Sequence, residues 1–291
     1  MSTINCIKCD SENSVDYDVF KKLQFVKCGN CGETFNLFGV YRSLYETVPL
    51  CKRMVDVAVD RTYAKYYVEA SNPKEKNAIE ETLGNNQFQK NLRQILHDQI
   101  LFGNCFLQMI RGDGGLVLRQ LEPTELDFSF DYVREPPFRG VSLEIVKMKK
   151  HSTPYTEYEI SNVLHFKGGW GVESIGDSIF GFWFTTWYFL RDIIKKFPLL
   201  DMEGERYKDL KEFREFKEST VLGAAGIPYH LIFPWMQTDP TYDKIEDKRF
   251  QYDIEERRSL ISRKIERKLF PVILNRNYEY ENFPRLVWQT A

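Results

Sequence analysis

The middle of the chain reads Asp98-Gln99-Ile100-Leu101-Phe102-Gly103-Asn104-Cys105-Phe106-Leu107, and the pattern of its apolar residues changes at the glycine. Before Gly103, apolar residues recur at helical spacing from Phe88 to Ile100, which predicts an amphipathic helix. After it, residues 104–119 have strand character around a glycine-rich turn at 111–115, which predicts a hairpin. A helix leading into an antiparallel hairpin indicates an α+β body.

Further elements are predicted on both sides of this hairpin. Strand signals lie at residues 127–130, 141–148, 155–160 and 163–166, and a last strand is predicted at 284–288. Toward the N-terminus, a helical pattern begins at Pro49, and a charged helix runs from Pro73 to about Leu83. The strands therefore cluster in the middle of the chain.

Three more helices are predicted in the second half of the chain, at about 179–197, about 202–221 and about 252–270. The first is rich in aromatic residues, among them Phe182, Trp183 and Trp187, which go most of the way round it. Such a helix must be buried against other elements or other subunits. The second carries balanced charges at high density, which is typical of a solvated face.

Four of the six cysteines form two Cys-x-x-Cys pairs, Cys6 with Cys9 and Cys28 with Cys31, separated by 18 residues. This spacing is typical of a zinc ribbon, because each turn aims two thiolates at one point and the pairs complete a tetrahedron. Four thiolates fill the coordination shell, so the predicted Zn²⁺ is structural. We divide the chain into a zinc ribbon at 1–38 and an α+β body at 39–291.

Other interpretations of the four cysteines are weaker. A redox motif needs no duplicate, and disulfides are disfavoured in a cytosolic chain, which the start of the sequence indicates because it has no signal-peptide pattern. Residues 1–38 are too few to fold by core burial alone, so metal binding is expected to supply much of their folding free energy. Phe35, Leu37 and Phe38 are expected to close the small apolar side of the ribbon.

The charge balance limits how the chain can contact nucleic acid. Lys and Arg number 40 against 42 Asp and Glu, a formal net charge of −2, which excludes a protein that coats nucleic acid by bulk electrostatics. The ribbon itself is slightly acidic, so it is expected to face a protein or brace its neighbour. The apolar stretch 178–190 is too short to span a membrane, and glycines and prolines interrupt the stretch 219–238.

The sequence contains no recognisable catalytic motif. Its four histidines are far apart in the sequence, and the glycine-rich stretch 168–181 lacks the spacing of a nucleotide-binding loop. Residues 176–180 miss the final glycine of a nucleophile elbow. We therefore expect that the chain is not an enzyme.

Several stretches, taken in order, resemble the body of tailed-virus portal proteins over residues 41–275. They begin with Leu44-Tyr45-Glu46-Thr47-Val48-Pro49-Leu50, residues 98–107 and Leu121-Glu122-Pro123. Val163-Leu164-His165-Phe166-Lys167 and Ile175-Gly176-Asp177-Ser178-Ile179-Phe180-Gly181 follow. The last are Phe213-Arg214-Glu215-Phe216, Leu222-Gly223-Ala224-Ala225-Gly226-Ile227-Pro228-Tyr229-His230-Leu231 and Lys268-Leu269-Phe270-Pro271.

This resemblance implies a body of wing and stem helices with a small mixed or antiparallel sheet. It implies a ring of subunits, usually twelve, at one vertex of a viral capsid, through which a terminase motor pumps double-stranded DNA that is later ejected. The partners implied are the terminase, the head–tail connector, and capsid or scaffold proteins. The location implied is the virion, and the host cytoplasm during assembly. The aromatic and charged helices would belong to the stem or its neighbours, and the segment with Pro228, His230 and Pro234 would face the channel.

The chain also departs from the family pattern. The stretch between the aromatic helix and Phe213 is short for a full clip domain, and an N-terminal zinc ribbon is an addition. We expect the ribbon to decorate the outer wing or to contact capsid or scaffold proteins. The alternative function is a zinc-ribbon nucleic-acid-binding regulator, in which residues 1–38 recognise the nucleic acid and the body dimerises; the acidic ribbon counts against it.

Overall fold

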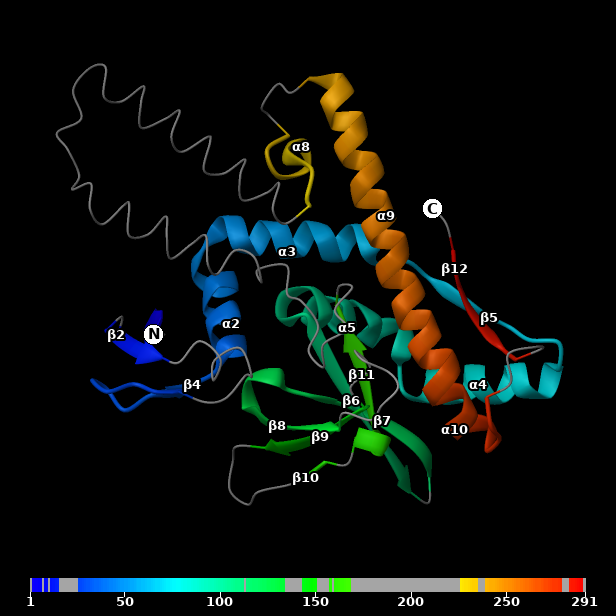
Figure 1. The fold of residues 1–291 in the computed structure, drawn as a ribbon. Helices are drawn as coiled ribbons and strands as arrows, with labels where there is room; N and C mark the ends of the chain where they lie inside the picture. The colour runs from blue at the N-terminus through cyan, green and yellow to red at the C-terminus, as the bar shows by residue number, and fades with distance from the viewer. Residues whose placement is uncertain are drawn as a thin grey trace.

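The structure is a computed structural model of the 291-residue chain. It describes residues 2–6, 8–9, 11–15, 26–112, 114–133, 143–150, 157–158, 160–168, 226–234, 239–278 and 283–289. These residues form a mixed α+β fold with small antiparallel sheets, as the sequence predicts, and their N-terminal cysteine segment is compatible with a zinc ribbon (Figure 1). Within these ranges, no helix combines the length and the hydrophobicity that a membrane span requires.

Most helices of the body begin at a polar cap or a proline. Asn36, Asn72 and Asp239 each accept a hydrogen bond from the first turn of a helix, and proline occupies the first turn of α3, α4 and α9, where its missing N–H costs nothing. The helices are α2 (Leu37–Thr47), α3 (Pro49–Thr62), α4 (Pro73–Asn85), α5 (Phe88–Phe102), α8 (Tyr229–Ile232), α9 (Pro240–Lys264) and α10 (Phe270–Leu274), with short 3-10 turns η1 (Pro123–Glu125) and η2 (Ile160–Asn162) and a π-helical segment η3 (Ile265–Leu269).

All strands pair antiparallel in five small sheets of the described residues. The sheet at the centre has the order β11-β6-β7, formed by Val163–Lys167, Asn104–Gly112 and Gly115–Leu121. The others are β1 (Ser2–Asn5) with β2 (Glu12–Val15), β3 (Val26–Lys27) with β4 (Thr34–Phe35), β5 (Tyr66–Glu69) with β12 (Arg285–Trp288), and β8 (Leu126–Val133) with β9 (Leu143–Lys150) and β10 (Glu157–Tyr158).

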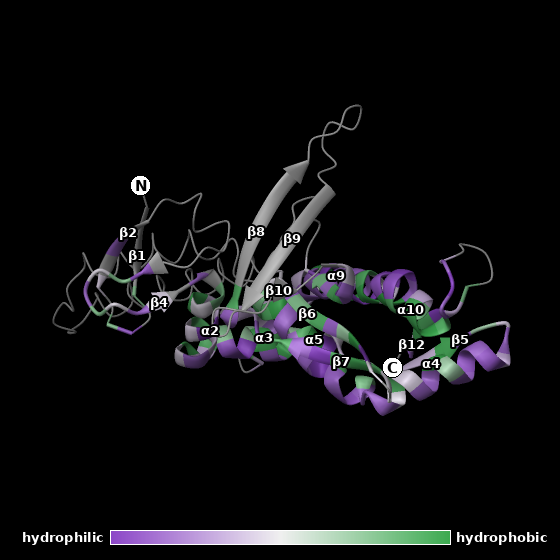
Figure 2. Cartoon of the chain, turned by 90° about the horizontal axis from the view of Figure 1, so that it is seen from below, coloured by the Kyte–Doolittle hydropathy of each residue, from purple (hydrophilic) through white to green (hydrophobic). Residues whose placement is uncertain are grey.

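The core lies between the helices and the central sheet. Helix α5 packs against α3 on one side and β6 on the other, and the long helix α9 crosses α3 and reaches β11 (Figure 1). Hydrophilic and hydrophobic residues are mixed along α3, α4 and α9 (Figure 2), as expected for helices that bury only one side. Helix α4, for example, buries only Ile79 and Leu83.

The helix-to-strand change at Gly103 is confirmed. Gly103 has φ +70°, a left-handed conformation that ends a helix readily only at glycine. Its carbonyl accepts from the amide of Gly168 at 2.7 Å, and the Gln99 side chain donates to the carbonyl of Lys167 at 2.8 Å. The end of α5 is therefore joined to the end of β11, and the predicted hairpin follows as β6 and β7.

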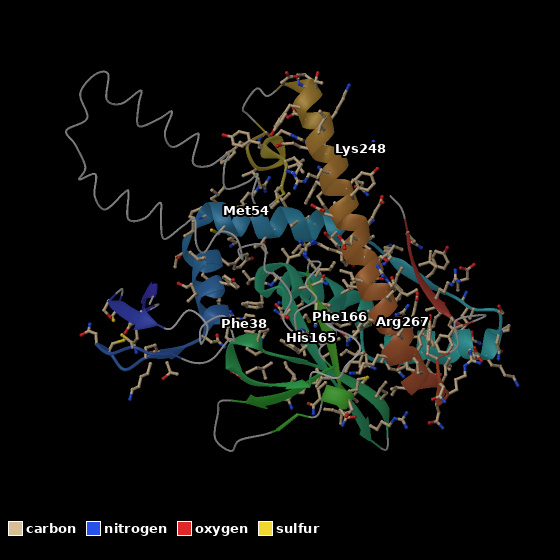
Figure 3. The ribbon with its side chains drawn as sticks, in the orientation of Figure 1. Phe38, Met54, His165, Phe166, Lys248 and Arg267 are labelled. Carbon is tan, nitrogen blue, oxygen red and sulfur yellow. The ribbon has the colours of Figure 1, made fainter. Side chains whose placement is uncertain are left out.

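Helix α2 begins just before the predicted end of the ribbon at residue 38. Asn36 caps α2 by accepting from the amide of Gly39 at 3.0 Å, so Leu37 and Phe38 lie in the first turn of this helix. Phe38, which was expected to close the ribbon, is fully buried in the core, with its ring edge-on to Phe102 at 5.5 Å between centroids (Figure 3). Gly39 follows Phe38 and weakens the helix signal there. The sequence pattern therefore predicted Phe38 in the ribbon and not in a helix.

Two further predictions need correction. The last helix begins at Pro240 and not near Tyr252, and the α-helix ends at Lys264 before the π-helical segment. The helical pattern that begins at Pro49 was expected to continue to Asn72, but residues 66–69 form β5, which pairs with the correctly predicted C-terminal strand β12. The aromatic helix with Phe182, Trp183 and Trp187 and the charged helix at 202–221 lie outside the described residues.

The buried imidazole of His165 makes stability depend on pH. It stacks on Phe106, and its Nε2 lies 2.8 Å from Asn104 Oδ1 in the centre of the molecule (Figure 3). Burial, with help from Lys167, Lys264 and Lys268, holds the pKa of His165 well below its ordinary value of 6.5. The folded chain therefore keeps the ring neutral at a pH where the unfolded chain takes up a proton.

We expect the stability that comes from keeping His165 neutral to be complete above pH 6.5. Below that pH, the free energy of unfolding should fall by about 1.4 kcal/mol per pH unit. Urea unfolding of the wild type and of His165→Gln at pH 5, 6, 7 and 8 measures it. The free energy of unfolding of the wild type should decline more steeply toward low pH than that of the variant. Equal slopes would show that His165 titrates alike in the folded and unfolded chains.

Candidate metal centre

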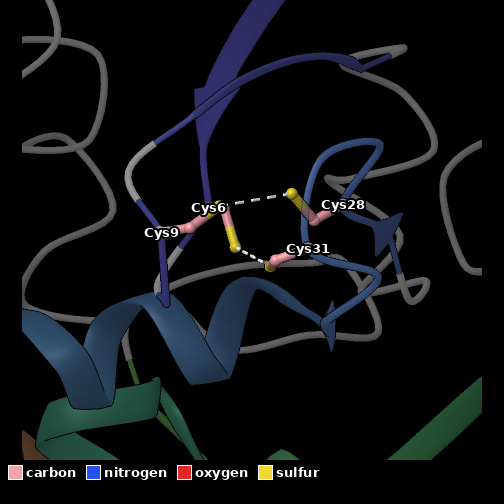
Figure 4. A group of neighbouring side chains, drawn as sticks. All are labelled: Cys6, Cys9, Cys28 and Cys31. Carbon is pink, nitrogen blue, oxygen red and sulfur yellow. Dashed lines mark hydrogen bonds between the residues drawn. The ribbon is translucent and has the colours of Figure 1, made fainter.

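The four N-terminal cysteines sit at the ends of two small antiparallel pairs. Cys6 follows β1, which pairs with β2, and Cys28 follows β3, which pairs with β4. The turn after each strand then brings in the second cysteine of the pair, Cys9 or Cys31. The two Cys-x-x-Cys turns face each other beside α2 (Figure 4).

The four sulfurs fit a tetrahedral metal ion. One ligand atom from each cysteine lies within 4.8 Å of the others, and all four cysteines are free thiols. The Sγ–Sγ distance is 3.5 Å between Cys6 and Cys31 and 3.7 Å between Cys9 and Cys28. Zinc–sulfur bonds of about 2.3 Å imply edges of about 3.8 Å in a regular tetrahedron. The predicted four-cysteine site is therefore present and can hold a metal ion.

Backbone hydrogen bonds fix the second turn tightly. The amide of Cys28 donates to the carbonyl of Glu33 at 2.7 Å, and the amide of Gly32 donates to the carbonyl of Cys28 at 3.0 Å. Gly32 has φ +74°, which an L side chain adopts only with strain. In the first turn, the amide of Cys6 donates to the carbonyl of Ser11 at 2.9 Å, and the amide of Lys8 points at Cys6 Sγ at 3.4 Å.

Two polar residues that the sequence pattern did not single out support the centre. Asn13 is 9% exposed; its amide nitrogen donates to the carbonyl of Ser11 at 2.9 Å, and its Oδ1 accepts from the amide of Gly29 at 2.9 Å. The Ser11 hydroxyl lies 3.1 Å from Cys9 Sγ and 3.2 Å from Cys28 Sγ. Asn13 thus joins the two turns, and only the fold brings it there.

The surroundings of the thiols favour the thiolate at Cys28. Backbone hydrogen bonding at Cys31, together with the Ser11 hydroxyl, lowers the pKa of Cys28 to about 5. At Cys31, the backbone hydrogen bond of Glu33 lowers the pKa, but burial and the neighbouring thiols outweigh it and raise the pKa to about 12. Four clustered sulfurs cannot all carry charge without a cation, whereas a bound metal ion removes that conflict.

Removing the Asn13 side chain is expected to weaken metal binding without abolishing it. Outer-shell partners of metal ligands typically contribute about 10–100-fold in affinity, and Asn13→Ala loses the hydrogen bond to Gly29 that joins the turns and the 3.6 Å contact with Cys28 Sγ. Competition with a zinc chelator measures the change. Lys27→Ala is the control, because the Lys27 side chain in β3 is exposed. Equal zinc affinities of Asn13→Ala and the wild type would show that Asn13 does not support the centre.

The remaining cysteines lie in the core, as predicted. Cys51 in α3 and Cys105 in β6 are both fully buried. Burial raises the pKa of Cys51 to about 12 and that of Cys105 well above its ordinary value. They act as small apolar residues and take no part in the centre.

The residues expected to face a channel have different environments. Pro228 is buried within the chain, and Pro234 is exposed. His230 is half-buried, and both ring nitrogens lie beside carboxylates of α9. That these residues face a channel stays a prediction.

Comparison with known proteins finds similarity at the level of structure. No family model matches the sequence, and no curated protein matches it. A chain from the neck of an empty GTA particle, computed with C6 symmetry, aligns with a TM-score of 0.59 and 12% identity, covering 86% of this chain and 84% of that one. A chain of the virion of a native gene transfer agent particle aligns with a TM-score of 0.54 and 12% identity, covering 86% and 83%.

The chain has the fold of these particle proteins. The alignment spans most of both chains, so the similarity concerns the whole architecture and not one small motif. At 12% identity it shows the fold alone. A shared fold does not by itself establish a shared function.

Proposed function

We propose that this chain is a portal subunit of a phage-like particle, and that copies of it form a ring through which double-stranded DNA is packaged and later ejected. The observation that carries the proposal is the fold shared with the neck chain of the GTA particle over 86% of this chain. The ordered sequence stretches that resemble tailed-virus portal proteins support it independently of the structural similarity.

Three of those stretches meet in the folded chain. Residues 44–50 form the junction of α2 with α3, residues 98–107 form the junction of α5 with β6, and residues 163–167 are β11, which pairs with β6. Helix α5 contacts both α2 and α3. The portal-like sequence therefore occupies the centre of the fold, where residues determine architecture.

The proposed ring places specific demands on its subunit. The family resemblance implies about twelve subunits at a capsid vertex, and partners that include the terminase motor, the head–tail connector, and capsid or scaffold proteins. The near balance of 40 Lys and Arg with 42 Asp and Glu suits a channel, because DNA must slide and each captured phosphate would hold it back. The proposed location is the virion, with assembly in the host cytoplasm.

We assign Zn²⁺ to the four-cysteine centre, in a structural role. Four sulfur ligands with tetrahedral spacing favour zinc, and the ion would hold the two short strand pairs together. The cysteine segment lies beside α2 at one edge of the molecule (Figure 1). Lys8, one of its few cations, is paired with Glu33 at 3.1 Å. This charge pairing supports a ribbon that contacts capsid or scaffold proteins over one that binds DNA.

The function we propose is assembly and not catalysis. Two of the histidines have structural surroundings that support this view: His165 is buried against Asn104 and Phe106, and His97 lies edge-on to Tyr45 beside the carboxylate of Asp98. The buried His165 ring serves packing, and the contacts of His97 hold its ring in place.

Light scattering of the purified, zinc-loaded protein tests the proposal. Twelve chains of 34.5 kDa give a species of about 414 kDa. A parallel measurement with capsid and scaffold proteins present covers rings that need a partner to nucleate. A monomer or dimer under both conditions would contradict the portal function. If a salt-dependent gel shift of DNA at submicromolar protein accompanied it, the result would favour the zinc-ribbon regulator.

A further inference from the structure

A second group of metal-ligating side chains lies between α8 and the first turns of α9. His230 comes from α8, and Asp243, Glu246 and Asp247 come from α9. Positions 243, 246 and 247 are three and four residues apart, so the three carboxylates project from one face of the helix. The amide of Tyr229 donates to Glu246 Oε2 at 3.2 Å, which holds α8 against this face.

Both nitrogens of the His230 ring lie beside carboxylates of α9. Nε2 lies 3.2 Å from Asp247 Oδ1, and Nδ1 lies 3.3 Å from Asp243 Oδ1. A histidine that ligates a metal ion donates its other ring N–H to a carboxylate or carbonyl group. The Asp247 contact fits this role: in the tautomer with the proton on Nε2, the ring would donate to Asp247 and turn the lone pair of Nδ1 toward Asp243.

The position of Nδ1 suits a metal ligand. His230 Nδ1 is buried, and it makes no hydrogen bond in the part of the chain that the structure describes. It lies 3.3 Å from a carboxylate oxygen of Asp243, and a cation bound by both groups would neutralise the carboxylate and occupy the nitrogen lone pair. One ligand atom each from His230, Asp243 and Glu246 lies within 4.8 Å of the others. Ligands about 2.1 Å from an octahedral ion are about 3 Å apart, which agrees with the His230–Asp243 distance.

We propose that His230 Nδ1, Asp243 and Glu246 bind one divalent cation, with Asp247 orienting the imidazole from the second shell. One nitrogen and two carboxylate ligands suit Mn²⁺ or Zn²⁺. His230 and Asp243 keep 23% and 22% of their side-chain surface exposed, so water completes the coordination shell. The ion joins α8 to α9, two helices that are separated in sequence by residues 233–239. This inference stands apart from the portal proposal.

Calorimetric titration of the full-length, zinc-loaded protein with Mn²⁺ tests the site. Mn²⁺ is the first probe because thiolate ligands do not favour it, so the four-cysteine centre does not compete. We expect one Mn²⁺ per chain, with affinity at least 100-fold lower in His230→Gln and in Glu246→Gln. Asp247→Asn is expected to lose about 10–100-fold, as outer-shell substitutions do. Glu255→Gln, on an exposed part of the same helix, is the matched control and keeps the wild-type affinity.

A second measurement keeps the test valid if one variant folds poorly. Saturating Mn²⁺ is expected to raise the thermal unfolding temperature of the wild type and of Glu255→Gln, but not that of His230→Gln. The proposal is overturned if neither Mn²⁺ nor a second equivalent of Zn²⁺ binds saturably, or if His230→Gln binds as the wild type does. A His230 ring with protons on both nitrogens at pH 7 in nitrogen NMR spectra, unchanged by Mn²⁺, would also overturn it, since a proton would then supply the positive charge.

Discussion

Replacing Cys28 with serine is expected to abolish zinc binding and to unfold the described ribbon residues, 2–6, 8–9, 11–15 and 26–35, while the body stays folded. The ribbon's strands are two to four residues long, and so small a unit lacks a core that can stabilise it. Structural zinc supplies about 10–16 kcal/mol in such units at neutral pH. The body has its own core, built on α3, α5, α9 and the central sheet.

Zinc content by mass spectrometry and amide hydrogen exchange measure this effect together. Exchange should become fast in residues 26–35 and remain slow in α5. Cys51→Ala is the matched control: Cys51 is a fully buried thiol outside the centre, so that variant keeps one zinc ion per chain. If Cys28→Ser kept both its zinc and slow exchange in the ribbon, the four-cysteine centre would not hold the ion.

Replacing Phe38 with alanine is expected to destabilise the body by about 3–5 kcal/mol, as large-to-small changes of buried phenylalanines do. Phe38 is fully buried, and the edge-to-face contact with Phe102 adds to the loss from burial. Urea unfolding monitored by helix content measures the change. Tyr252→Ala, at a residue 61% exposed, is the control and should alter the free energy of unfolding by less than about 0.5 kcal/mol.

The Phe38 substitution also tests where the body begins. Because Phe38 packs edge-on to Phe102 of α5, its effect should be the same with zinc bound and after chelation. A loss of stability that disappears when zinc is removed would show that Phe38 stabilises the ribbon and not the body.

The sequence predicts those parts of the fold that depend on local signals. The turn at Gly103, the hairpin at 111–115 and the strand at 163–166 each follow from residues next to one another in the chain. The four-cysteine centre was predictable for the same reason, because the spacing of two Cys-x-x-Cys pairs indicates a metal site. The α+β class follows from these elements together.

What the sequence does not predict depends on partners far away in the chain. Strand β5 is four residues long and pairs with β12 near the other end of the chain, so its own pattern is too short to distinguish it from helix. Phe38 was placed in the ribbon because nothing nearby shows that Phe102 is its neighbour. Asn13 and the carboxylates around His230 gain their roles only when turns or helices meet.

Electron microscopy of the zinc-loaded protein, alone and with capsid and scaffold proteins, tests the central claim most directly. The account predicts closed rings with an open central channel, in which the α+β body of residues 36–289 fits each subunit and the four-cysteine segment projects from one edge. Compact monomers or dimers in both preparations, with no ring, would contradict it.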